Sequence, residues 1–280
     1  KQILARFVFS LYHKKILKNR ISVNSIEETI EHLVKSEDSL VRFGDGEIKL
    51  IAGKEIPFQK PDPALAGRLK DILQTEEAGL SVALPDIFED VSAYVEKSQS
   101  FWMEHLLFHR REYNRYCCVR VYENAFFSRP YIMYRDKTES AELFRRMKQI
   151  WENQKIVFVE GDISHNGVDR FENAASIERI ICPSSQAWER YTEILDACRQ
   201  LPKDRLMLVS LGAAGKVLTV DLHRLGYRVI DVGSLDMEYG WFCEGAAEKC
   251  RVIKHEIHTR EENEAAGYFD YLDQILTTIH

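Results

Sequence analysis

Residues 205–233 read RLMLVSLGAAGKVLTVDLHRLGYRVIDVG, and they give the clearest indication of the fold class of the chain. The apolar runs at 206–211 and 227–232 each predict a strand that is buried on both faces. Residues 216–225, which lie between them, have the length and the apolar spacing of a helix. Two buried strands that are joined through a helix form a parallel pair, so the stretch predicts an α/β unit.

The same alternation of strands and helices extends over most of the chain. Further strands are predicted at 40–43, 80–84, 117–121, 155–159 and 177–181, and further helices near 26–35 and at about 91–111, 138–151 and 186–199. Ser25 and Glu28 have the spacing of a capping box at the start of the first of these helices. The pattern predicts one Rossmann-like α/β domain over residues 22–280, with a mainly parallel sheet flanked by helices.

Residues 1–21 differ from the rest because they carry basic residues and no acidic ones. Ile3, Leu4 and Phe7 begin an apolar stripe at helical spacing, so we predict a basic amphipathic helix. Such a helix lies on an anionic membrane surface, or it packs on its own domain or on a partner subunit. The stretch has no continuous apolar run long enough to span a bilayer.

Composition argues against two classes of protein. A formal net charge of −6 argues against a nucleic-acid-binding protein, which usually carries a basic face. The six cysteines form no C-x-x-C pair and have no zinc-site spacing, so we expect reduced thiols in a cytoplasmic protein.

The first candidate site is the sequence RFGDGE at 42–47, which follows a predicted strand. The carboxylates of Asp45 and Glu47 are separated by one glycine, and Mg²⁺ or Mn²⁺ is commonly held by one or two carboxylates together with phosphate oxygens. Arg42 next to them can contact a diphosphate. The alternative is a tight turn, because Asp-Gly is a common turn dipeptide.

Two further candidates also follow predicted strands, where ligands of open α/β sheets bind. Gly212, Gly215 and Lys216 lie between a strand and a helix, a position that favours an anion such as phosphate or serves only as a close turn. Asp236 and Glu238 follow the last predicted strand and offer a general base, a metal ligand or an acidic helix start.

Polar groups in two other loops add weaker candidates. Asn124 and Arg129 can contact the ribose, the base or the diphosphate of a nucleotide, or they cap loops and form surface ion pairs. His165 lies in the glycine-flanked loop 160–167 and is a candidate acid or base, or a hydrogen-bonding loop residue.

Taken together and in this order, these segments resemble the GT-D fold glycosyltransferases, a family once catalogued as a domain of unknown function. The resemblance covers roughly residues 22–260 and rests on RFGDGE at 42–47, LPD at 84–86, FSR at 127–129, ICP within 180–183, and the segments from 211 to 239. It implies a Rossmann-like enzyme in which Asp45 and Glu47 hold Mn²⁺ or Mg²⁺ against a nucleoside diphosphate sugar. Members of the family build surface glycans of Gram-positive bacteria.

From this resemblance we expect transfer of a hexose from a UDP-sugar, UDP-glucose or a related one, to a capsule-type polysaccharide precursor, an adhesin glycan or a lipid-linked oligosaccharide. Asp236 or Glu238 would remove the proton from the acceptor hydroxyl of an inverting enzyme. The expected sugar-nucleotide contacts are Arg42, Gly44, Gly46, Asn124, Arg129, Gly212, Gly215 and Lys216. We expect the protein in the cytoplasm, at the inner face of the membrane. The alternatives are a non-catalytic sugar-nucleotide-binding protein and another Rossmann-type nucleotide-dependent transferase.

Overall fold

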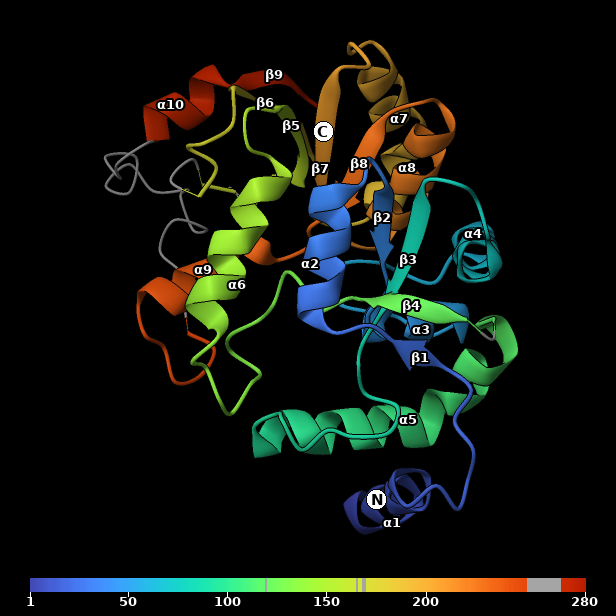
Figure 1. The fold of residues 1–280 in the computed structure, drawn as a ribbon. Helices are drawn as coiled ribbons and strands as arrows, with labels where there is room; N and C mark the ends of the chain where they lie inside the picture. The colour runs from blue at the N-terminus through green and yellow to red at the C-terminus, as the bar shows by residue number, and fades with distance from the viewer. Residues whose placement is uncertain (119, 165, 168–169, 251–267) are drawn as a thin grey trace.

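The chain is represented by a computed structural model that describes residues 1–118, 120–164, 166–167, 170–250 and 268–280. Its centre is a sheet in which nine strands from these residues pair in parallel, in the order β1-β4-β3-β2-β8-β7-β5-β6-β9 (Figure 1). The strands are β1 (Ser22–Val23), β2 (Ser39–Arg42), β3 (Leu80–Leu84), β4 (Val121–Asn124), β5 (Lys155–Gly161), β6 (Ser176–Cys182), β7 (Arg205–Ser210), β8 (Arg228–Asp231) and β9 (Ile275–Thr278). The predicted single-domain, Rossmann-like α/β fold is confirmed.

The middle strands are buried on both faces, as their apolar runs predict. In β5, Ile156 and Phe158 point into one apolar core while Val157 and Val159 point into the other, and none of the four is exposed to solvent. Successive side chains of a strand point to opposite faces, so a strand without polar residues at alternate positions needs cover on both sides.

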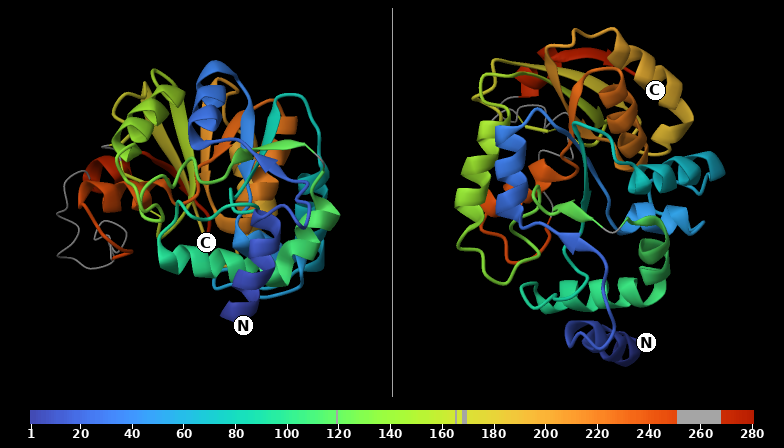
Figure 2. Two further views of the ribbon diagram at one scale, coloured as in Figure 1. Left: turned by 60° about the horizontal axis from the view of Figure 1, so that its bottom comes forward. Right: turned by 45° about the vertical axis from the view of Figure 1, so that its right-hand side comes forward.

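Helices provide this cover, as the two views of Figure 2 show. On one face lie α2 and α6, and on the other lie α4, α7 and α8. The helices are α1 (Gln2–His13), α2 (Ile26–Lys35), α3 (Asp45–Ile51), α4 (Pro63–Gln74), α5 (Glu96–Tyr116), α6 (Ser140–Met147), α7 (Tyr191–Arg199), α8 (Gly212–Arg224), α9 (Leu235–Cys243) and α10 (Tyr268–Asp273), with short 3-10 turns at Lys148–Ile150 and Ala187–Arg190. Ser25 and Glu28 form the predicted capping box of α2.

Two halves of the chain meet in the middle of the sheet. Strands β1 to β4 lie on one side and β5 to β9 on the other, and they join where Leu40 of β2 pairs with Ile230 of β8. The carboxyl ends of β2, β8 and β7 therefore open side by side, the position at which open α/β sheets bind ligands.

Some predicted boundaries are wrong. The strand predicted at 117–121 is not there, because α5 continues to Tyr116 with Cys117 as its C-cap, and β4 begins only at Val121. Helix α8 begins at Gly212 rather than at 216. Helices α3, α4 and α9 were not predicted; α3 and α9 contain the residues that we interpreted as strand-end loops.

The predicted N-terminal helix is present as α1, which ends at His13. It packs against α5 by burying Ala5 and Phe9, and the Tyr12 ring lies 3.6 Å from the Arg110 guanidinium. Within the described residues, no helix combines the length and the apolar character that crossing a bilayer requires.

A buried ion pair ties the C-terminal segment to the sheet. Arg179 of β6 and Glu160 of β5 are both fully buried, with Nη1 and Oε1 2.6 Å apart. Tyr271 donates a hydrogen bond to the same carboxylate oxygen, and Arg179 Nε donates to Gln274 Oε1. This network fixes the start of β9 against the end of the sheet.

Candidate functional site

A polar cleft of about 310 Å³ lies at the carboxyl ends of β2, β5, β7 and β8. It is lined by Arg42, Phe43, Gly44, Glu47, Phe58, Gly161, Ile163, Ser164, Ser184, Ser210, Leu211, Gly212, Lys216, Gly233 and Ser234. Five of the predicted site residues are among these: Arg42, Gly44, Glu47, Gly212 and Lys216. We call this space the polar cleft.

The RFGDGE sequence runs from the last residue of β2, Arg42, into the first turn of α3, which begins at Asp45. The helix is the element that neither the metal-loop nor the tight-turn interpretation predicted. Gly44 is the N-cap, and its amide N–H donates a hydrogen bond to Glu47 Oε2 at 2.7 Å. The other oxygen of this carboxylate, Oε1, borders the polar cleft 4.0 Å from Lys216 Nζ. Asp45 points to the other side of the turn, where Oδ2 accepts a hydrogen bond from Lys49 Nζ at 2.6 Å.

A buried aspartate holds two cations at the cleft. Asp231, at the end of β8, accepts a 2.6 Å hydrogen bond from Lys216 Nζ and lies 3.8 Å from Arg42 Nη1. Burial lowers the pKa of the Arg42 guanidinium, and the negative charge of Asp231 opposes that effect. Arg42 Nε also donates to the carbonyl of Ala125 at 2.7 Å, so both cations are held in fixed positions beside Glu47.

Glycines let the backbone come close to these cations. Gly233 has φ = +51°, and a Cβ atom there would lie 2.0 Å from Arg42 Nη1. Gly212 also has a positive φ of +50° and starts α8 at the edge of the cleft. The N-terminus of a thirteen-residue helix, with Lys216 in its first turns, is an environment that favours an anion such as a phosphate.

Two predicted glycines do not line the polar cleft. Gly215 packs α8 against β7, since a Cβ atom there would lie 2.8 Å from Val209 Cγ1. Gly46 lies against Ile56, whose Cδ1 would be 3.3 Å from a Cβ atom at this position. The backbone geometry explains why a small residue suits both positions, and their contact with a sugar nucleotide stays a prediction.

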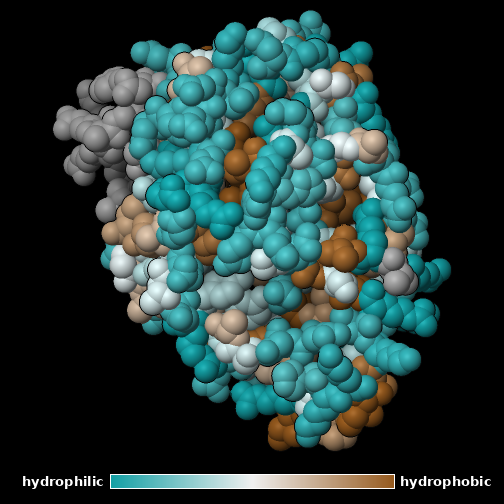
Figure 3. All heavy atoms as spheres, in the orientation of Figure 1, coloured by the Kyte–Doolittle hydropathy of each residue, from teal (hydrophilic) through white to brown (hydrophobic). Residues whose placement is uncertain are grey.

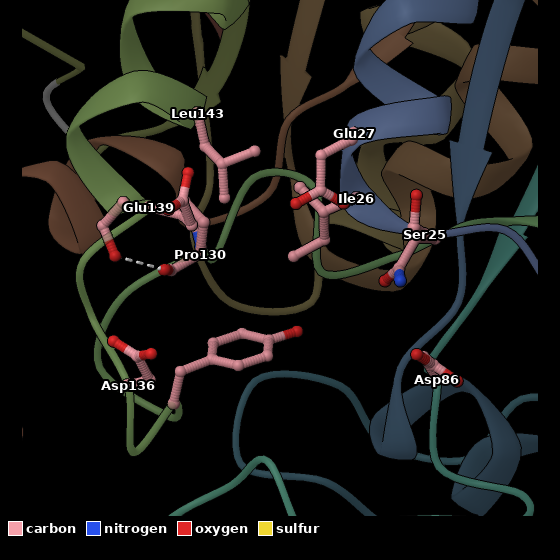
Figure 4. Close-up of a pocket in the computed structure, with 11 residues that line it drawn as sticks. Ser25, Ile26, Glu27, Asp86, Pro130, Asp136, Glu139 and Leu143 are labelled. Carbon is pink, nitrogen blue, oxygen red and sulfur yellow. Dashed lines mark hydrogen bonds between the residues drawn. The ribbon is translucent and has the colours of Figure 1, made fainter.

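Asn124 lines a different cavity, of about 260 Å³, between α2, α6 and the ends of β3 and β4 (Figure 4). Its side chain donates to the carbonyl of Asn24 at 3.0 Å and accepts from the amide of Phe126 at 2.9 Å. The cavity is acidic, and its carboxylates are those of Glu27, Asp86, Asp136 and Glu139. The structure therefore does not bring Asn124 together with Lys216 and Glu47.

Asp236 and Glu238 lie in the first turn of α9 and are almost completely buried. Asp236 Oδ1 accepts a hydrogen bond from the amide of Gly167 at 2.9 Å. Glu238 Oε1 accepts from the amides of Tyr131 and Ile132, at 2.9 and 2.7 Å. Neither residue lines the polar cleft; both hold neighbouring loops, and their role as a catalytic base stays a prediction. His165 lies outside the described residues.

Arg129 and Asp45 line a second cleft on the other side of the first turn of α3. Arg129 Nε lies 3.8 Å from Glu238 Oε2, so α9 and the loop after β4 are joined electrostatically. The predicted metal ligands therefore face two different spaces, with Glu47 toward the polar cleft and Asp45 toward the second cleft.

The acidic side chains fit a divalent cation only when a ligand contributes to its coordination. Among the residues that the structure describes, no group of three or more His, Cys, Asp or Glu side chains has the geometry to hold a metal ion. Mg²⁺ usually needs only one or two carboxylates if phosphate oxygens and waters complete its shell. Glu47 borders the phosphate-favouring polar cleft and meets that lesser requirement as one carboxylate, whereas Asp45 faces the second cleft across the same turn.

Sequence reasoning missed Asp231, Ser210 and Gly233. Ser210 Oγ donates to the carbonyl of Gly233 at 2.6 Å, and this bond joins the ends of β7 and β8. A signal for Asp231 was available, because it is a charged residue at the end of an apolar run. Because buried charges are usually paired, Asp231 could have been expected to have a cationic partner at the same sheet edge.

Comparison with known proteins finds that the family model described as glycosyltransferase GT-D fold matches residues 40–261. The chain is 42% identical over 249 residues to the probable glycosyl transferase Gly of Streptococcus gordonii, and 40% identical over 246 residues to glycosyltransferase GlyD of Streptococcus pneumoniae serotype 4. These alignments cover 88% and 87% of this chain but 36% and 30% of the relatives. The chain thus spans about a third of the length of the curated relatives that it matches.

Two solved structures extend the comparison to the fold. A structure described as a new glycosyltransferase from Streptococcus sanguinis is 39% identical, with a TM-score of 0.85, and the match covers 93% of this chain and 100% of that one. A second, described as the highly conserved domain of unknown function 1792 with a distinct glycosyltransferase fold, is 37% identical with a TM-score of 0.88 and full coverage of both chains.

Proposed function

The chain belongs to the glycosyltransferase GT-D fold family, and we propose that it transfers a hexose from a nucleoside diphosphate sugar to a glycan acceptor. The observation that carries this proposal is the polar cleft, in which Arg42 and Lys216 lie with the N-terminus of α8 beside Glu47. A diphosphate needs cations and amide donors, and a transferase must also stabilise the charge that grows on its leaving diphosphate. The names of the relatives point to the same reaction class.

We assign the donor as a UDP-sugar, UDP-glucose or a related one, and the binding groups as follows. Lys216 and Arg42 contact the diphosphate, and the amides at Gly212 and along the first turn of α8 donate to it. Asp45 and Glu47 would hold Mn²⁺ or Mg²⁺, and the bound ion would add positive charge beside the diphosphate. A surface glycan, either a capsule-type polysaccharide precursor or an adhesin glycan, is the acceptor class.

We propose Asp236 or Glu238 as the base for the acceptor hydroxyl of an inverting enzyme. A general base must reach the proton that it removes, directly or through one water molecule. Glu238 Oε2 has no hydrogen-bond partner among the described residues and lies 3.8 Å from Arg129 Nε. The side chain is completely buried, and its Oε1 holds the loop at 131–132.

We also propose that α1 contacts the inner face of the cytoplasmic membrane. Ile3 and Phe7 expose 86% and 60% of their surface on the side of α1 that faces away from α5. Figure 3 shows apolar side chains gathered at the end of the molecule where α1 lies. Lys14, Lys15 and Lys18 follow this patch, so apolar and basic groups are placed together as an anionic lipid surface requires.

The donor proposal is tested by thermal unfolding with nucleoside diphosphates and their sugars, in Mn²⁺, Mg²⁺ or EDTA. A ligand at 100 times its dissociation constant stabilises the folded protein by about 2.7 kcal/mol, so one nucleotide should raise the melting temperature in metal and not in EDTA. Asp45→Ala should abolish that metal dependence and lower transfer at least ~100-fold. Release of the diphosphate over time separates an enzyme from a non-catalytic nucleotide-binding protein.

The matched control is Lys49→Met, which breaks the same 2.6 Å ion pair and leaves the Asp45 carboxylate in place. If Asp45 served only in that partly buried pair, the two variants would behave alike. A fully active Asp45→Ala enzyme would contradict the proposed metal site. An unchanged melting temperature with every nucleotide would contradict the donor proposal.

A further inference from the structure

The second cleft, of about 240 Å³, lies between the first turn of α3, the start of α5 and the loop at 129–133. We call it the aromatic cleft because Phe101 and Trp102 form part of its wall. The two rings meet edge to face, with centroids 4.9 Å apart. Trp102 is buried, whereas Phe101 exposes 45% of its surface.

The aromatic cleft shares a wall with the polar cleft. Asp45 lines the former and Glu47 the latter, and both stand in the first turn of α3. The positive charge of Arg129, in the aromatic cleft, contributes to lowering the pKa of Arg42 in the polar cleft. A molecule in one cleft therefore lies next to a molecule in the other.

We propose that the aromatic cleft binds the acceptor sugar. This inference rests on the proposed function, because a glycosyltransferase must bring a donor sugar and an acceptor sugar together at one carbon atom. Two clefts on either side of one carboxylate-bearing turn provide that arrangement, with the diphosphate held in the polar cleft by Lys216 and Gly212. The acceptor is then a pyranose at the end of a glycan.

The lining of the cleft suits a sugar ring. A pyranose has an apolar face, which packs on an exposed aromatic ring such as Phe101, and hydroxyl groups around its edge. Arg129, Glu248 and Lys249 line the same space and supply charged donors and acceptors for those hydroxyls. The volume is below the ~300–1,000 Å³ of pockets for drug-sized ligands, and thus suits one ring rather than a long chain.

The walls are held in place by hydrogen bonds that do not involve the ligand. The amide of Val95, at the start of α5, donates to the carbonyl of Met133 at 2.9 Å. Glu238 accepts from the amide of Ile132, so α9 fixes the same loop from behind. A preformed wall loses little entropy when a ligand binds, which favours weak but specific sugar recognition.

The test uses the methyl glycosides of glucose, galactose and N-acetylglucosamine with the whole chain, observed by saturation-transfer NMR. We expect at least one glycoside to bind the wild type, and Phe101→Ala to weaken it about tenfold, a loss of ~1.4 kcal/mol. Phe108→Ala is the matched control, since Phe108 is on the same helix, is 50% exposed and does not line the cleft. Its affinity for the glycoside should equal that of the wild type.

A donor sugar and an acceptor sugar share this chemistry, and competition separates them. An acceptor glycoside stays bound when UDP-glucose and Mn²⁺ are added in excess, whereas a glycoside that occupies the donor-sugar position is displaced, which overturns the proposal. Absence of binding by all three glycosides, or equal binding by Phe101→Ala and the wild type, also overturns it. Thermal shifts of the same samples with UDP measure binding in the polar cleft independently. A protein that binds UDP but no glycoside would contradict the acceptor proposal alone and leave the proposed function standing.

Discussion

Gly233 is the residue at which the cleft depends most directly on a missing side chain. Its φ of +51° is costly for other residues, by about 1–2 kcal/mol, and a Cβ atom would lie 2.0 Å from Arg42 Nη1. We predict that Gly233→Ala displaces the Arg42 guanidinium from Asp231, lowers the free energy of unfolding by more than the backbone cost and removes the nucleotide-induced thermal shift. Urea unfolding and the thermal-shift assay measure the two effects.

Gly226→Ala measures the free-energy cost of a positive φ without the steric clash that is present at Gly233. Gly226 has φ = +85°, and a Cβ atom there would meet no heavy atom within 4 Å. We expect this variant to lose only about 1–2 kcal/mol and to keep its nucleotide response. Equal losses of stability and binding in the two variants would contradict the close approach of Gly233 to Arg42.

Individual site residues were predictable where a motif marks the end of a strand. Arg42, Glu47 and Lys216 were found in this way, because each lies within two residues of a glycine at the end of an apolar run. Asp231 and Phe101 were not, since their roles depend on which strand or helix becomes their neighbour. In the sequence, Phe101 does not differ from other aromatic residues of a long helix. Its position in a cleft follows only from the packing of α3 against α5.

At the scale of elements, a histidine links α2 to β4. His32 Nδ1 lies 2.6 Å from Glu123 Oε1, and Nε2 lies 3.0 Å from Asp38 Oδ2. Burial by itself would lower the pKa of His32, but the hydrogen bonds and charges of Glu123 and Asp38 outweigh it and raise the pKa. The folded state therefore favours the protonated ring more than the unfolded chain does.

The sign of the pH effect follows from that raised pKa. The stabilisation is fully present below the unfolded pKa of about 6.5 and is lost as the pH rises through the higher pKa of the folded state. We predict that His32→Gln lowers the free energy of unfolding by about 1 kcal/mol at pH 6 and by less at pH 8. Urea titrations across this range measure the difference, and a constant difference at all pH values would refute it. Asp38→Asn should have a smaller effect of the same sign.

Helices and strands were predicted correctly where the apolar periodicity was strong. The predictions failed where a helix cap determined the structure. The strands at 80–84 and 155–159 were placed correctly or nearly so, because they consist mostly of apolar residues. Helix α3 was missed because DGE looks like a turn, although Glu47 at its third position closes a helical turn on Gly44. The wrong strand at 117–121 has a similar cause, since nothing local shows that α5 ends at Tyr116.

At the scale of the whole molecule, the clefts and α1 form one arrangement. Pairing of β2 with β8 could not be read from the sequence, because the two strands are far apart in the chain. That pairing nevertheless creates the polar cleft. Helix α1 packs along α5, whose first turns line the aromatic cleft, and Arg6 Nη2 lies 3.5 Å from Glu96 Oε1 beside them. Membrane contact through α1 would therefore place the acceptor cleft near the lipid surface, where a lipid-linked acceptor is found.

This arrangement predicts binding to anionic vesicles through both the apolar and the basic parts of residues 1–20. Burying a large apolar side chain contributes about 1.5–3 kcal/mol, so Ile3→Ser combined with Phe7→Ser should weaken vesicle binding at least tenfold. Each Lys or Arg near an anionic surface adds about 1 kcal/mol, so replacing phosphatidylserine with phosphatidylcholine should also weaken it. Vesicle co-sedimentation measures both changes.

Leu225→Ser combined with Leu276→Ser is the control, because these leucines are 41% and 48% exposed and lie outside α1. If the control pair weakens binding equally, or if neither pair matters, α1 does not dock on lipid, and its exposed face serves a protein contact instead.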